Sequence, residues 1–410
     1  MLEELKMPES HVFRDAIHGY IHVEHVPIWQ LINTAEFQRL RRIKQLGGSS
    51  MVFPSAEHSR FVHSLGTYEL VRQLTNHEAI RNVIDDYETL TVMCAGLLHD
   101  IGHGPFSHSF EEVFGGFHED MTVKIILGPT EVNKVLSYYD RHLPEDVAAV
   151  IKKTHPRKVL VQMVTSQLDA DRMDYLARDS YFAGVTYGEF DRERILRTLR
   201  VVDQHIVFKE SGVQAIEDYI LARYYMYWQV YYHPTSRSYE HLLNSLILRI
   251  KDLYKEGYPF KTNMRFLRPF LEEKVTVRDY IALDETVLMT MIRCFREEED
   301  RILSDLADRF LNRRLFKYQT LVSGETLKHV KACSENAGYD PRYYVTDDDA
   351  MQIPYTTYNV NGHIGEIDIL QPDGHVCPLP ERSEIVHTII QSRPKQDKKV
   401  FYVKEIENEL

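Results

Sequence analysis

One segment constrains the fold of this chain more than any other: an apolar run that ends abruptly in ionisable residues. Residues 91–98 are almost entirely apolar, and His99 and Asp100 follow them directly. Such a run predicts a buried helix, and two polar groups at its end cost free energy unless they have partners. The Gly-His-Gly-Pro segment at 102–105 then interrupts the helix. The pattern predicts a buried polar site where a core helix ends.

Helical periodicity dominates the chain up to about residue 320. We predict helices over 27–43, 63–72, 91–100, 159–178 and 213–232. A weak alternation over 205–208, close to Gly212, predicts a short β-hairpin. The fold class expected from these segments is mainly α, with one short hairpin.

The sequence texture changes beyond residue 320. Short β-like runs at 355–360 and 365–370 are separated by glycines, prolines and the acidic tract 347–349. We therefore predict a core domain over residues 1–320 and a small α+β appendage over 321–410. For the appendage we expect a role in assembly or regulation.

Composition limits the class of protein. The apolar fraction of 43% and charged fraction of 27% are typical of a soluble globular chain. The net charge of −12 argues against broad binding to nucleic acid, which needs many cations. The sequence has no signal-peptide pattern at its start and no apolar run of membrane-spanning length. Its four cysteines are scattered and form no CxxC pair, so they suggest neither a zinc ribbon nor a disulfide framework: Cys94, Cys294, Cys333 and Cys377. We expect a cytoplasmic protein that does not enter membranes.

Two histidines and two aspartates are candidate ligands of one divalent metal: His63, His99, Asp100 and Asp171. A mixed nitrogen and oxygen set suits Mg, Mn, Fe or Zn, and it does not choose among them. A metal held in this way can activate water and polarise a phosphoryl oxygen. A single His-Asp pair is more often a buried histidine bonded to its neighbour, so the context of the pair carries the argument. That context points to hydrolysis of a phosphate ester, with the metal site within residues 50–180.

Four motifs carry a resemblance to a known family. The segments 37–48, 57–66, 99–108 and 169–179 resemble the HD-domain deoxynucleoside triphosphate (dNTP) triphosphohydrolases. The chain looks like a bacterial relative of the catalytic core of the mammalian SAM-and-HD-domain enzyme. The resemblance covers residues 11 to 320, and it implies an HD-domain helical core with one metal per subunit, held by His63, His99, Asp100 and Asp171.

The resemblance also implies a reaction. In this family water attacks the α-phosphorus of a dNTP and releases the deoxynucleoside and intact inorganic triphosphate. Asp100 would act within the metal centre. The leaving 5′-oxygen needs a proton, and the family-matched histidines beside the site are His103 and His118, of which one should be the general acid. Without the family, His118 would be taken for an ordinary loop histidine.

A triphosphate tail needs cations around it. The candidates are Arg60, Arg172 and Arg223, of which Arg60 lies three residues before His63. Each arginine alone would more often form a surface ion pair. The family match favours Arg60 and Arg223, whereas the better-known relatives carry Lys at the position of Arg172.

The family match also implies a pocket for the deoxyribose. Its residues here would be Gln45, Leu46, Tyr175, Asp179 and Tyr231. Tyr175 under the sugar would exclude a 2′-hydroxyl, and Asp179 with Gln45 could bind the 3′-hydroxyl. Asp179 could instead be a helix-end residue. The other tyrosines of 219–232 are expected in the core and at subunit contacts. Base preference does not follow from these residues.

Members of the family are often homotetramers with a regulatory nucleotide at the subunit interface. The matching residues here are Arg14, Asn33, Gln38 and Arg41. The resemblance thus implies a homotetramer with an allosteric activator, (d)GTP or another dNTP. Relatives that read guanine there use Asp where this chain has Asn33, so guanine specificity does not transfer.

Two other functions compete with dNTP hydrolysis. The first is another HD-type phosphohydrolase, such as a nucleotidase or a cyclic nucleotide phosphodiesterase. It offers no common role for Arg60, Arg223, Gln45 and Tyr175. The second is a nucleotide-sensing module with weak activity, against which the complete metal quartet argues.

Overall fold

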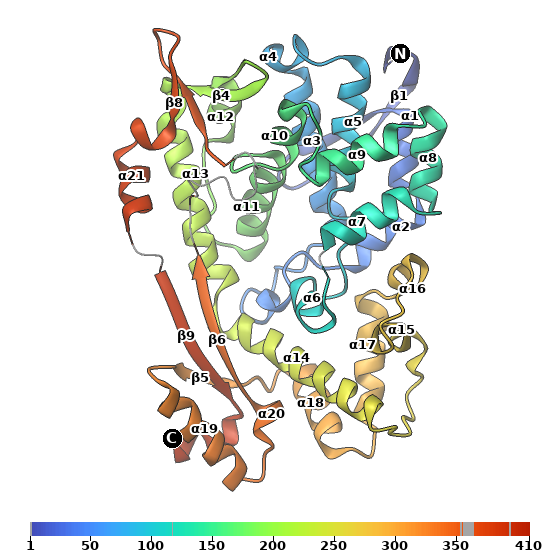
Figure 1. The fold of residues 1–410 in the computed structure, drawn as a ribbon, viewed down its shortest axis with the longest axis vertical. Helices are drawn as coiled ribbons and strands as arrows, with labels where there is room; N and C mark the ends of the chain where they lie inside the picture. The colour runs from blue at the N-terminus through green and yellow to red at the C-terminus, as the bar shows by residue number, and fades with distance from the viewer. Residues whose placement is uncertain (1, 117, 353–354, 356–364, 393–394) are drawn as a thin grey trace.

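The computed structural model describes residues 2–116, 118–352, 355, 365–392 and 395–410, and its fold is mainly α (Figure 1). The helices of the N-terminal half are α1 (Val26–Ile32), α2 (Ala35–Arg39), α3 (Arg60–Asn76), α4 (Glu78–Arg81), α5 (Asp86–Leu98), α6 (His108–Phe114), α7 (His118–Leu127), α8 (Glu131–Tyr139), α9 (Leu143–Ile151), α10 (Lys158–Val164), α11 (Ala170–Ala183) and α12 (Arg192–Thr198). The helices that follow are α13 (Val213–Met226), α14 (Pro234–Lys255), α15 (Arg268–Leu271), α16 (Val277–Ala282), α17 (Glu285–Phe295), α18 (Arg301–Leu311), α19 (Gly324–Asn336), α20 (Pro341–Tyr344) and α21 (Glu384–Gln391).

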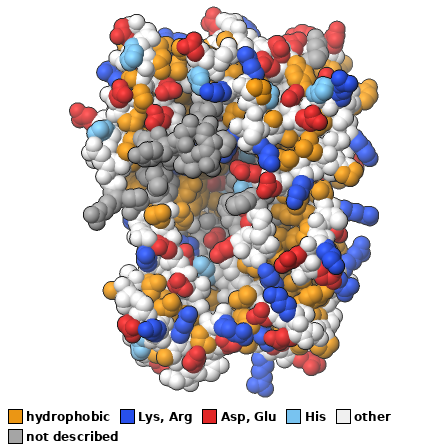
Figure 2. Space-filling view, viewed as in Figure 1, with side chains coloured by type: hydrophobic (Ala, Val, Ile, Leu, Met, Phe, Trp, Pro, Cys, Tyr) orange, Lys and Arg blue, Asp and Glu red, His pale blue; other side chains and the backbone are white. Residues whose placement is uncertain are grey.

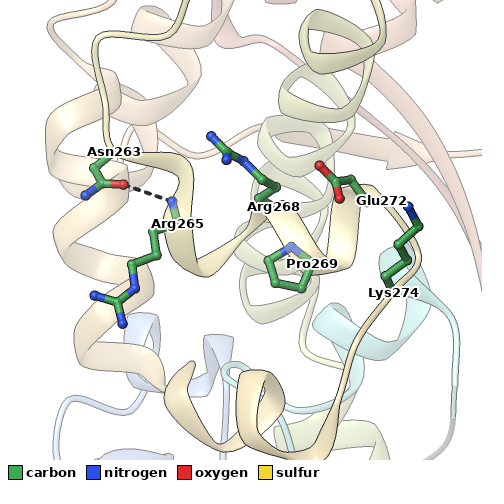
Figure 3. A pocket seen from close by; sticks show the side chains of 6 residues that line it. All are labelled: Asn263, Arg265, Arg268, Pro269, Glu272 and Lys274. Atoms are coloured by element: carbon green, nitrogen blue, oxygen red, sulfur yellow. Dashed lines mark hydrogen bonds between the residues drawn. The ribbon is translucent and has the colours of Figure 1, made fainter.

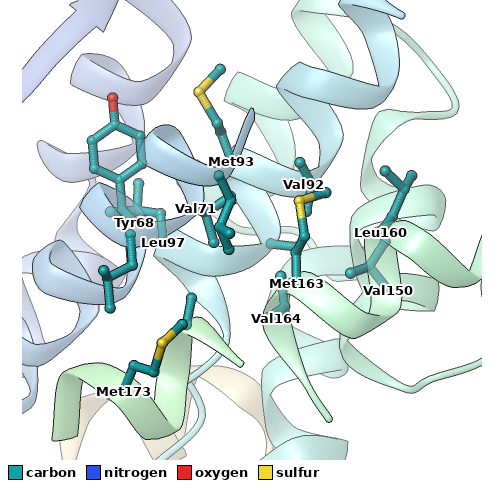
Figure 4. Close-up of a cluster of buried hydrophobic side chains, with 14 of the residues drawn as sticks. Tyr68, Val71, Val92, Met93, Leu97, Val150, Leu160, Met163, Val164 and Met173 are labelled. Atoms are coloured by element: carbon teal, nitrogen blue, oxygen red, sulfur yellow. The ribbon is translucent and has the colours of Figure 1, made fainter. Parts of the chain in front are cut away.

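The apolar run of the sequence is the central helix of the core. Helix α5 begins with a capping box at Asp85 and Glu88 and is buried from Leu90 to Leu98. Side chains from α3, α9, α10 and α11 pack against it (Figure 4). Helix α5 ends where the sequence predicts, since His99 is its C-terminal cap. The ionisable pair therefore emerges from the middle of the core.

Two helices predicted as continuous are interrupted. The segment 27–43 divides into α1 and α2 because the Thr34 hydroxyl donates to Leu31 O and accepts from Phe37 N. The segment 159–178 divides into α10 and α11, since the Asp169 carboxylate accepts from the amides of Ser166 and Arg172. In both places a capping side chain starts a new helix within an unbroken apolar period.

The predicted hairpin at 205–208 is confirmed, and a second hairpin occurs that the periodicity did not predict. Strands β3 (Leu199–Val202) and β4 (His205–Lys209) pair antiparallel. At the start of the chain, β1 (Lys6–Asp15) pairs antiparallel with β2 (Gly19–His25). Strand β1 is largely exposed and polar, so it lacks the alternation that identifies a half-buried strand.

The C-terminal region contributes strands to two sheets. Strands β7 (Asp368–Leu370) and β8 (Val376–Pro378) extend the β3–β4 hairpin, and β4 and β7 are parallel. Strands β5 (Lys317–Thr320), β9 (Lys395–Tyr402) and β6 (Val345–Gln352) form the second sheet in that order. The strand expected at 355–360 lies outside the described residues except for Tyr355. The predicted boundary at residue 320 stays a proposal.

Within the described part of the chain, none of the helices combines the length and apolar character needed to cross a bilayer.

Candidate metal centre and active site

Three side chains bring nitrogen and oxygen atoms to one point. His63 lies in the first turn of α3, His99 caps α5, and Asp171 lies in the first turn of α11. The two imidazole Nε2 atoms are 3.2 Å apart, and Asp171 Oδ1 is 3.1 Å from the first and 3.5 Å from the second. Both imidazoles are almost fully buried, whereas the Asp171 side chain is 33% exposed. Three helices thus converge on a site with one open side.

The chemistry of these donors fits a divalent cation. Burial alone would lower the pKa of His63, but hydrogen bonds to Asp171 and Asp174 raise it to about 10. The carboxylates that hold a proton there would equally attract a metal ion, which binds the neutral imidazole in place of that proton. Two imidazoles and a carboxylate within 4.8 Å form a suitable ligand set.

The fourth predicted ligand, Asp100, lies beside this group and has other partners. Its oxygens are 3.4 Å from His99 Nε2 and 3.6 Å from His63 Nε2. Arg60 Nη1 donates to Asp100 Oδ2 at 2.5 Å, and two nitrogens of the same guanidinium reach Ser107 Oγ. Arg60 therefore orients the carboxylate of Asp100 next to the three-residue group.

The two predicted proton donors lie together on the other side of Asp100. The rings of His103 and His118 stack with centroids 3.8 Å apart. His103 Nε2 is 3.3 Å from Asp100 Oδ1, and Glu111 approaches Nδ1 of both histidines, at 3.3 Å and 3.1 Å. The His103 side chain is 3% exposed and that of His118 is 23% exposed. Sequence reasoning missed Glu111, which no motif singled out.

A cavity of about 880 Å³ joins most of the predicted residues. Of the predicted catalytic and substrate residues, those that line it are Gln45, Leu46, Arg60, Asp100, His103, His118, Asp171, Arg172, Tyr175, Asp179 and Tyr231. A volume of this size accommodates a nucleotide. The cavity brings together side chains from segments more than 180 residues apart in the sequence.

A buried polar cluster contributes to the wall of this cavity through Asp179 and Tyr231. Asp179 Oδ2 accepts a hydrogen bond from the Tyr231 hydroxyl at 2.8 Å, and Asp179 Oδ1 is 2.7 Å from His58 Nε2. Burial, together with the charge of Asp179, raises the pKa of Tyr231 well above its usual value, so this phenol stays a donor. His58 was not predicted, although its place five residues before His63 puts it close to α3.

The remaining predicted cations differ in position. Arg172 lines the cavity, and its Nε donates to Ser166 O and to Asp169. Arg223 is not among the residues that line the cavity; its guanidinium carbon lies 5.9 Å from the centre of the Tyr227 ring. Arg237, which was not predicted, does line it.

The four predicted regulatory residues lie outside this cavity. Arg14 stacks over Tyr20, and Arg41 lies 3.5 Å above the Phe61 ring. Asn33 Nδ2 donates to Trp29 O, and Arg41 Nε donates to Gln38 Oε1. Arg14 thus lies on β1 and Asn33 at the end of α1, while Gln38 and Arg41 contact each other at α2 and just after it.

The C-terminal region supplies part of the cavity wall. Asp348, Asp349, Ala350 and Met351 of β6 line it together with Arg237 and His241 of α14. Asp348 pairs with Arg237 and lies 3.1 Å from His241 Nε2. No local signal in the acidic tract 347–349 could have indicated this position.

A second hollow, of about 290 Å³, lies at α15 (Figure 3). It is lined by Asn263, Arg265, Arg268, Pro269, Glu272 and Lys274 and contains none of the predicted residues.

On the face of the molecule in Figure 2, Lys and Arg side chains are mixed with Asp and Glu. The cavity beside the candidate metal ligands contains most of the predicted residues, so it is the candidate active site.

The chain is similar to known proteins in sequence and in fold. The HD domain family matches residues 60–179, and the family described as HD associated region matches residues 190–256. An uncharacterised protein of Bacillus subtilis, YwfO, is 47% identical and covers 98% of this chain and 94% of its own. A solved phosphohydrolase from Bacteroides thetaiotaomicron is 30% identical with a TM-score of 0.86, covering 97% of this chain and 100% of that one.

The deoxynucleoside triphosphate triphosphohydrolase SAMHD1 homolog of Dictyostelium discoideum is also similar. It is 30% identical over 78% of this chain and 62% of its own length. A mainly helical fold with a buried His/Asp cluster at the end of its core helix fits a phosphohydrolase that uses a divalent metal. This chain belongs to the HD-domain phosphohydrolase family.

Proposed function

We propose that this chain hydrolyses dNTPs at the α-phosphorus and releases a deoxynucleoside and intact inorganic triphosphate. The observation that carries the proposal is the composition of one cavity. Its wall combines two of the candidate metal ligands, Asp100 and Asp171, with a histidine pair beside Asp100, three arginines and a buried Asp–Tyr pair, and His63 and His99 lie directly behind Asp171. These are the groups needed for a phosphoryl centre, a leaving oxygen, a polyphosphate and a sugar hydroxyl.

His63, His99, Asp100 and Asp171 would hold one divalent metal, which when bound polarises a phosphoryl oxygen and activates water. Arg60 keeps Asp100 ionised and oriented through its hydrogen bond at 2.5 Å. The same guanidinium lines the cavity, so it can also face an incoming phosphate.

We assign the proton donor to His118 rather than His103. Both histidines line the cavity, but His103 is enclosed by two carboxylates and is 3% exposed, whereas His118 is 23% exposed. Glu111 at His118 Nδ1 would accept a hydrogen bond from the ring and fix its orientation. His103 would then position His118 by stacking on it.

The substrate would bind in the cavity, with its triphosphate at the arginines and its sugar at the buried pair of Asp179 and Tyr231. Arg60 and Arg172 offer cations to the triphosphate, while Arg223 would act through Tyr227. Tyr175, Gln45 and Leu46 would enclose the sugar, and Asp179, held by Tyr231, would accept the 3′-hydroxyl.

Regulation is proposed at a separate place. Arg14, Asn33, Gln38 and Arg41 would hold an activating nucleotide, (d)GTP or another dNTP, between subunits of a homotetramer. Their position outside the cavity, around β1, α1 and α2, supports a site distinct from the substrate site. Light scattering after size-exclusion chromatography, with and without dGTP, tests the assembly.

One product analysis tests the reaction. The protein is incubated with Mg²⁺ or Mn²⁺ and each dNTP, with and without dGTP, and the products are separated by anion exchange. Triphosphate and deoxynucleoside are expected. Pyrophosphate with dNMP, or the absence of turnover with every metal, would contradict the proposal.

A pair of histidine variants tests the metal centre. His99→Ala should abolish turnover and metal binding, because it removes one of the converging nitrogens. The matched control is His387→Ala on the exposed surface of α21, which should behave as the unmodified protein. Full activity of His99→Ala would exclude the ligand assignment.

A further inference from the structure

The metal-ligating histidine of α3 is attached to a buried carboxylate that sequence reasoning did not select. Asp174 lies one turn after Asp171 on α11, and its Oδ2 is 2.8 Å from His63 Nδ1. The side chains of Asp174 and Arg178 have no exposed surface. His63 therefore presents Nε2 to the metal ligands and Nδ1 to Asp174.

Asp174 accepts four hydrogen bonds, two on each oxygen. Oδ1 receives His18 Nε2 at 2.6 Å and Arg178 Nη2 at 2.9 Å. Oδ2 receives His63 Nδ1 and Arg178 Nε, both at 2.8 Å. A carboxylate has about four lone-pair sites, so this group is fully satisfied and cannot rotate without breaking bonds.

Two partners of Asp174 depend on the turn of the N-terminal hairpin: His18 lies in this turn, and Arg178 is bound by Asp15 at its start. His18 lies in the turn between β1 and β2. Asp15, the last residue of β1, accepts from Arg178 Nη1 at 2.7 Å and also from the backbone amides of Ile17 and His18. The carboxylate of Asp15 thus both stabilises the turn and holds Arg178 against Asp174.

The protonation of His18 follows from its second neighbour. Arg192 Nη1 lies 3.3 Å from His18 Nδ1, and a guanidinium can only donate. His18 Nδ1 is therefore the acceptor, and Nε2 carries the proton that Asp174 Oδ1 accepts. Asp174 in turn accepts the Nδ1 proton of His63, which leaves the Nε2 lone pair of His63 for a metal.

A glycine on α3 allows the network to form. A Cβ at Gly66, one turn after His63, would lie 1.9 Å from Asp174 Oδ1 and 2.4 Å from Arg178 Nη2. Helices α3 and α11 are in extensive contact, and only a residue without a side chain leaves room for the carboxylate. The space at Gly66 is therefore filled by the Asp174–Arg178 pair.

We infer that Asp174 is the positioning residue of the metal-binding histidine His63, and that Asp15 and His18 in the hairpin turn set its orientation. The inference rests on the metal centre of the proposed function, and it extends that centre to the N-terminal hairpin. The hairpin turn then contributes to metal affinity although none of its residues lies among the ligands.

Substitution of Asp174 by Asn tests the first link. The amide is isosteric with the carboxylate, but its NH2 group would face N–H donors of Arg178 and of one histidine. Donor would then face donor at that position, and these groups would repel each other. Partners of this kind, when removed, typically weaken metal binding by about 10–100-fold. We expect Asp174→Asn to raise the Kd for Mn²⁺, measured by isothermal titration calorimetry, by a factor in that range.

Asp15→Asn tests the second link with less risk to folding. The new side-chain amide can still accept from the two turn amides, but its NH2 group would face Arg178 instead of pairing with it. We expect a rise in the Kd for Mn²⁺ of about threefold or more, smaller than for Asp174→Asn because the effect is indirect. The matched control is Glu9→Gln on the exposed part of β1, which should leave the Kd unchanged.

The double variant separates positioning from general structural damage. If Asp15 acts through Asp174, Asp15→Asn should have no further effect on the Kd in the Asp174→Asn background. Unfolding midpoints, measured after the metal has been removed by a chelator, show which variants fold. If Asp174→Asn does not fold, the Kd values of Asp15→Asn and of its control Glu9→Gln decide the inference. A full additive effect in the double variant would overturn the inference, as would an unchanged Kd in Asp15→Asn.

The metal readout also keeps this inference distinct from the proposed reaction. Mn²⁺ binding that responds to both variants supports the inference even if product analysis finds no dNTP turnover. Tight Mn²⁺ binding that ignores both variants overturns the inference and leaves the reaction intact. A protein that binds neither Mn²⁺ nor Zn²⁺ would overturn the inference together with the proposed metal centre.

Discussion

At the scale of single residues, the candidate site is built from carboxylates whose partners are fixed. Asp179 is 2% exposed and is held by Tyr231 and His58, so its two oxygens keep one orientation towards the cavity. A buried acceptor held in this way discriminates strongly between ligands that do and do not donate to it. The geometry thus suits recognition of a sugar hydroxyl.

This arrangement predicts a selective effect of Asp179→Asn. Hydrogen bonds to charged groups contribute about 1.5–3 kcal/mol, so kcat/KM for a dNTP should fall by about 10–150-fold. The matched control is the corresponding 2′,3′-dideoxynucleotide, which lacks the 3′-hydroxyl and should lose much less. Equal losses for both substrates would contradict a role for Asp179 at the 3′-hydroxyl.

The contact at Gly66 leads to a prediction about stability. In Gly66→Ala the new methyl group would collide with Asp174 and Arg178, both fully buried. Overpacking of this kind costs about 1–3 kcal/mol, so the unfolding midpoint measured after chelation should fall. Gly324→Ala is the control, because its Cβ would meet nothing within 4 Å at the start of α19. A midpoint equal to that of the unmodified protein would refute the close approach of α3 and α11.

At the scale of elements, α5 is the helix around which the core is organised. Its residues from Leu90 onward are buried, and α3, α9 and α10 pack against it. Capping residues rather than apolar periodicity decide where neighbouring helices begin, as Thr34 and Asp169 illustrate. The packing of these helices fixes the distance between His63 and His99.

Leu160 of α10 tests the packing around α5. Its side chain is fully buried in the cluster of Figure 4. Leu160→Ala should lower the free energy of unfolding by about 2–5 kcal/mol, through lost burial and the cavity left behind. Leu127→Ala at the end of α7 is the control, since that side chain is 47% exposed and should matter by about 0.5 kcal/mol at most. Chemical denaturation measures both, and equal effects would contradict the position of α10.

At the scale of the whole molecule, the candidate site lies between two hydrophobic clusters. One contains α3, α5, α10 and α11, and the other contains α14, α17, α18 and β9. Phe106 and Phe110, just after the His-Asp pair, belong to the second cluster. The ion pair of Asp348 with Arg237 joins β6 to α14 at the cavity wall between them.

Asp348 gives this junction a pH dependence. Burial alone would raise its pKa, but hydrogen bonds from His241 and Arg237 lower it to about 2, below the ordinary 3.8. A folded-state pKa below the ordinary value stabilises the fold above about pH 4, and this contribution disappears as the pH falls through about 2. At pH 7 the shift corresponds to about 2 kcal/mol.

The measurement compares Asp348→Asn with the unmodified protein by urea denaturation. The difference in free energy of unfolding should be about 2 kcal/mol at pH 7 and should shrink as the pH is lowered from 5 towards 3. The control Asp349→Asn removes a half-exposed carboxylate and should change the stability by less than about 1 kcal/mol. A difference that is independent of pH would show that Asp348 is not stabilised in its ionised form.

Much of the site could be predicted because its residues belong to local patterns. His99 and Asp100 stand out since an apolar helix ends at them, and His63 and Asp171 follow from motif spacing. Asp174 and Arg178 were also open to prediction, because their helical spacing from Asp171 places them along α11. Glu111, His58 and Asp348 carry no such pattern. Glu111 of α6 contacts His118 at the start of α7, whereas His58 and Asp348 enter the site through contacts far along the chain.

By itself the sequence determined the mainly α fold, the central buried helix and the ionisable pair at its end. These follow from apolar periodicity and from the free-energy cost of burying ionisable groups without partners. Only the tertiary structure decided how the hairpin turn reaches Asp174, and how β6 comes to line the cavity. Both depend on packing between segments distant in the chain, where position is set by the helices and strands in between rather than by any local pattern.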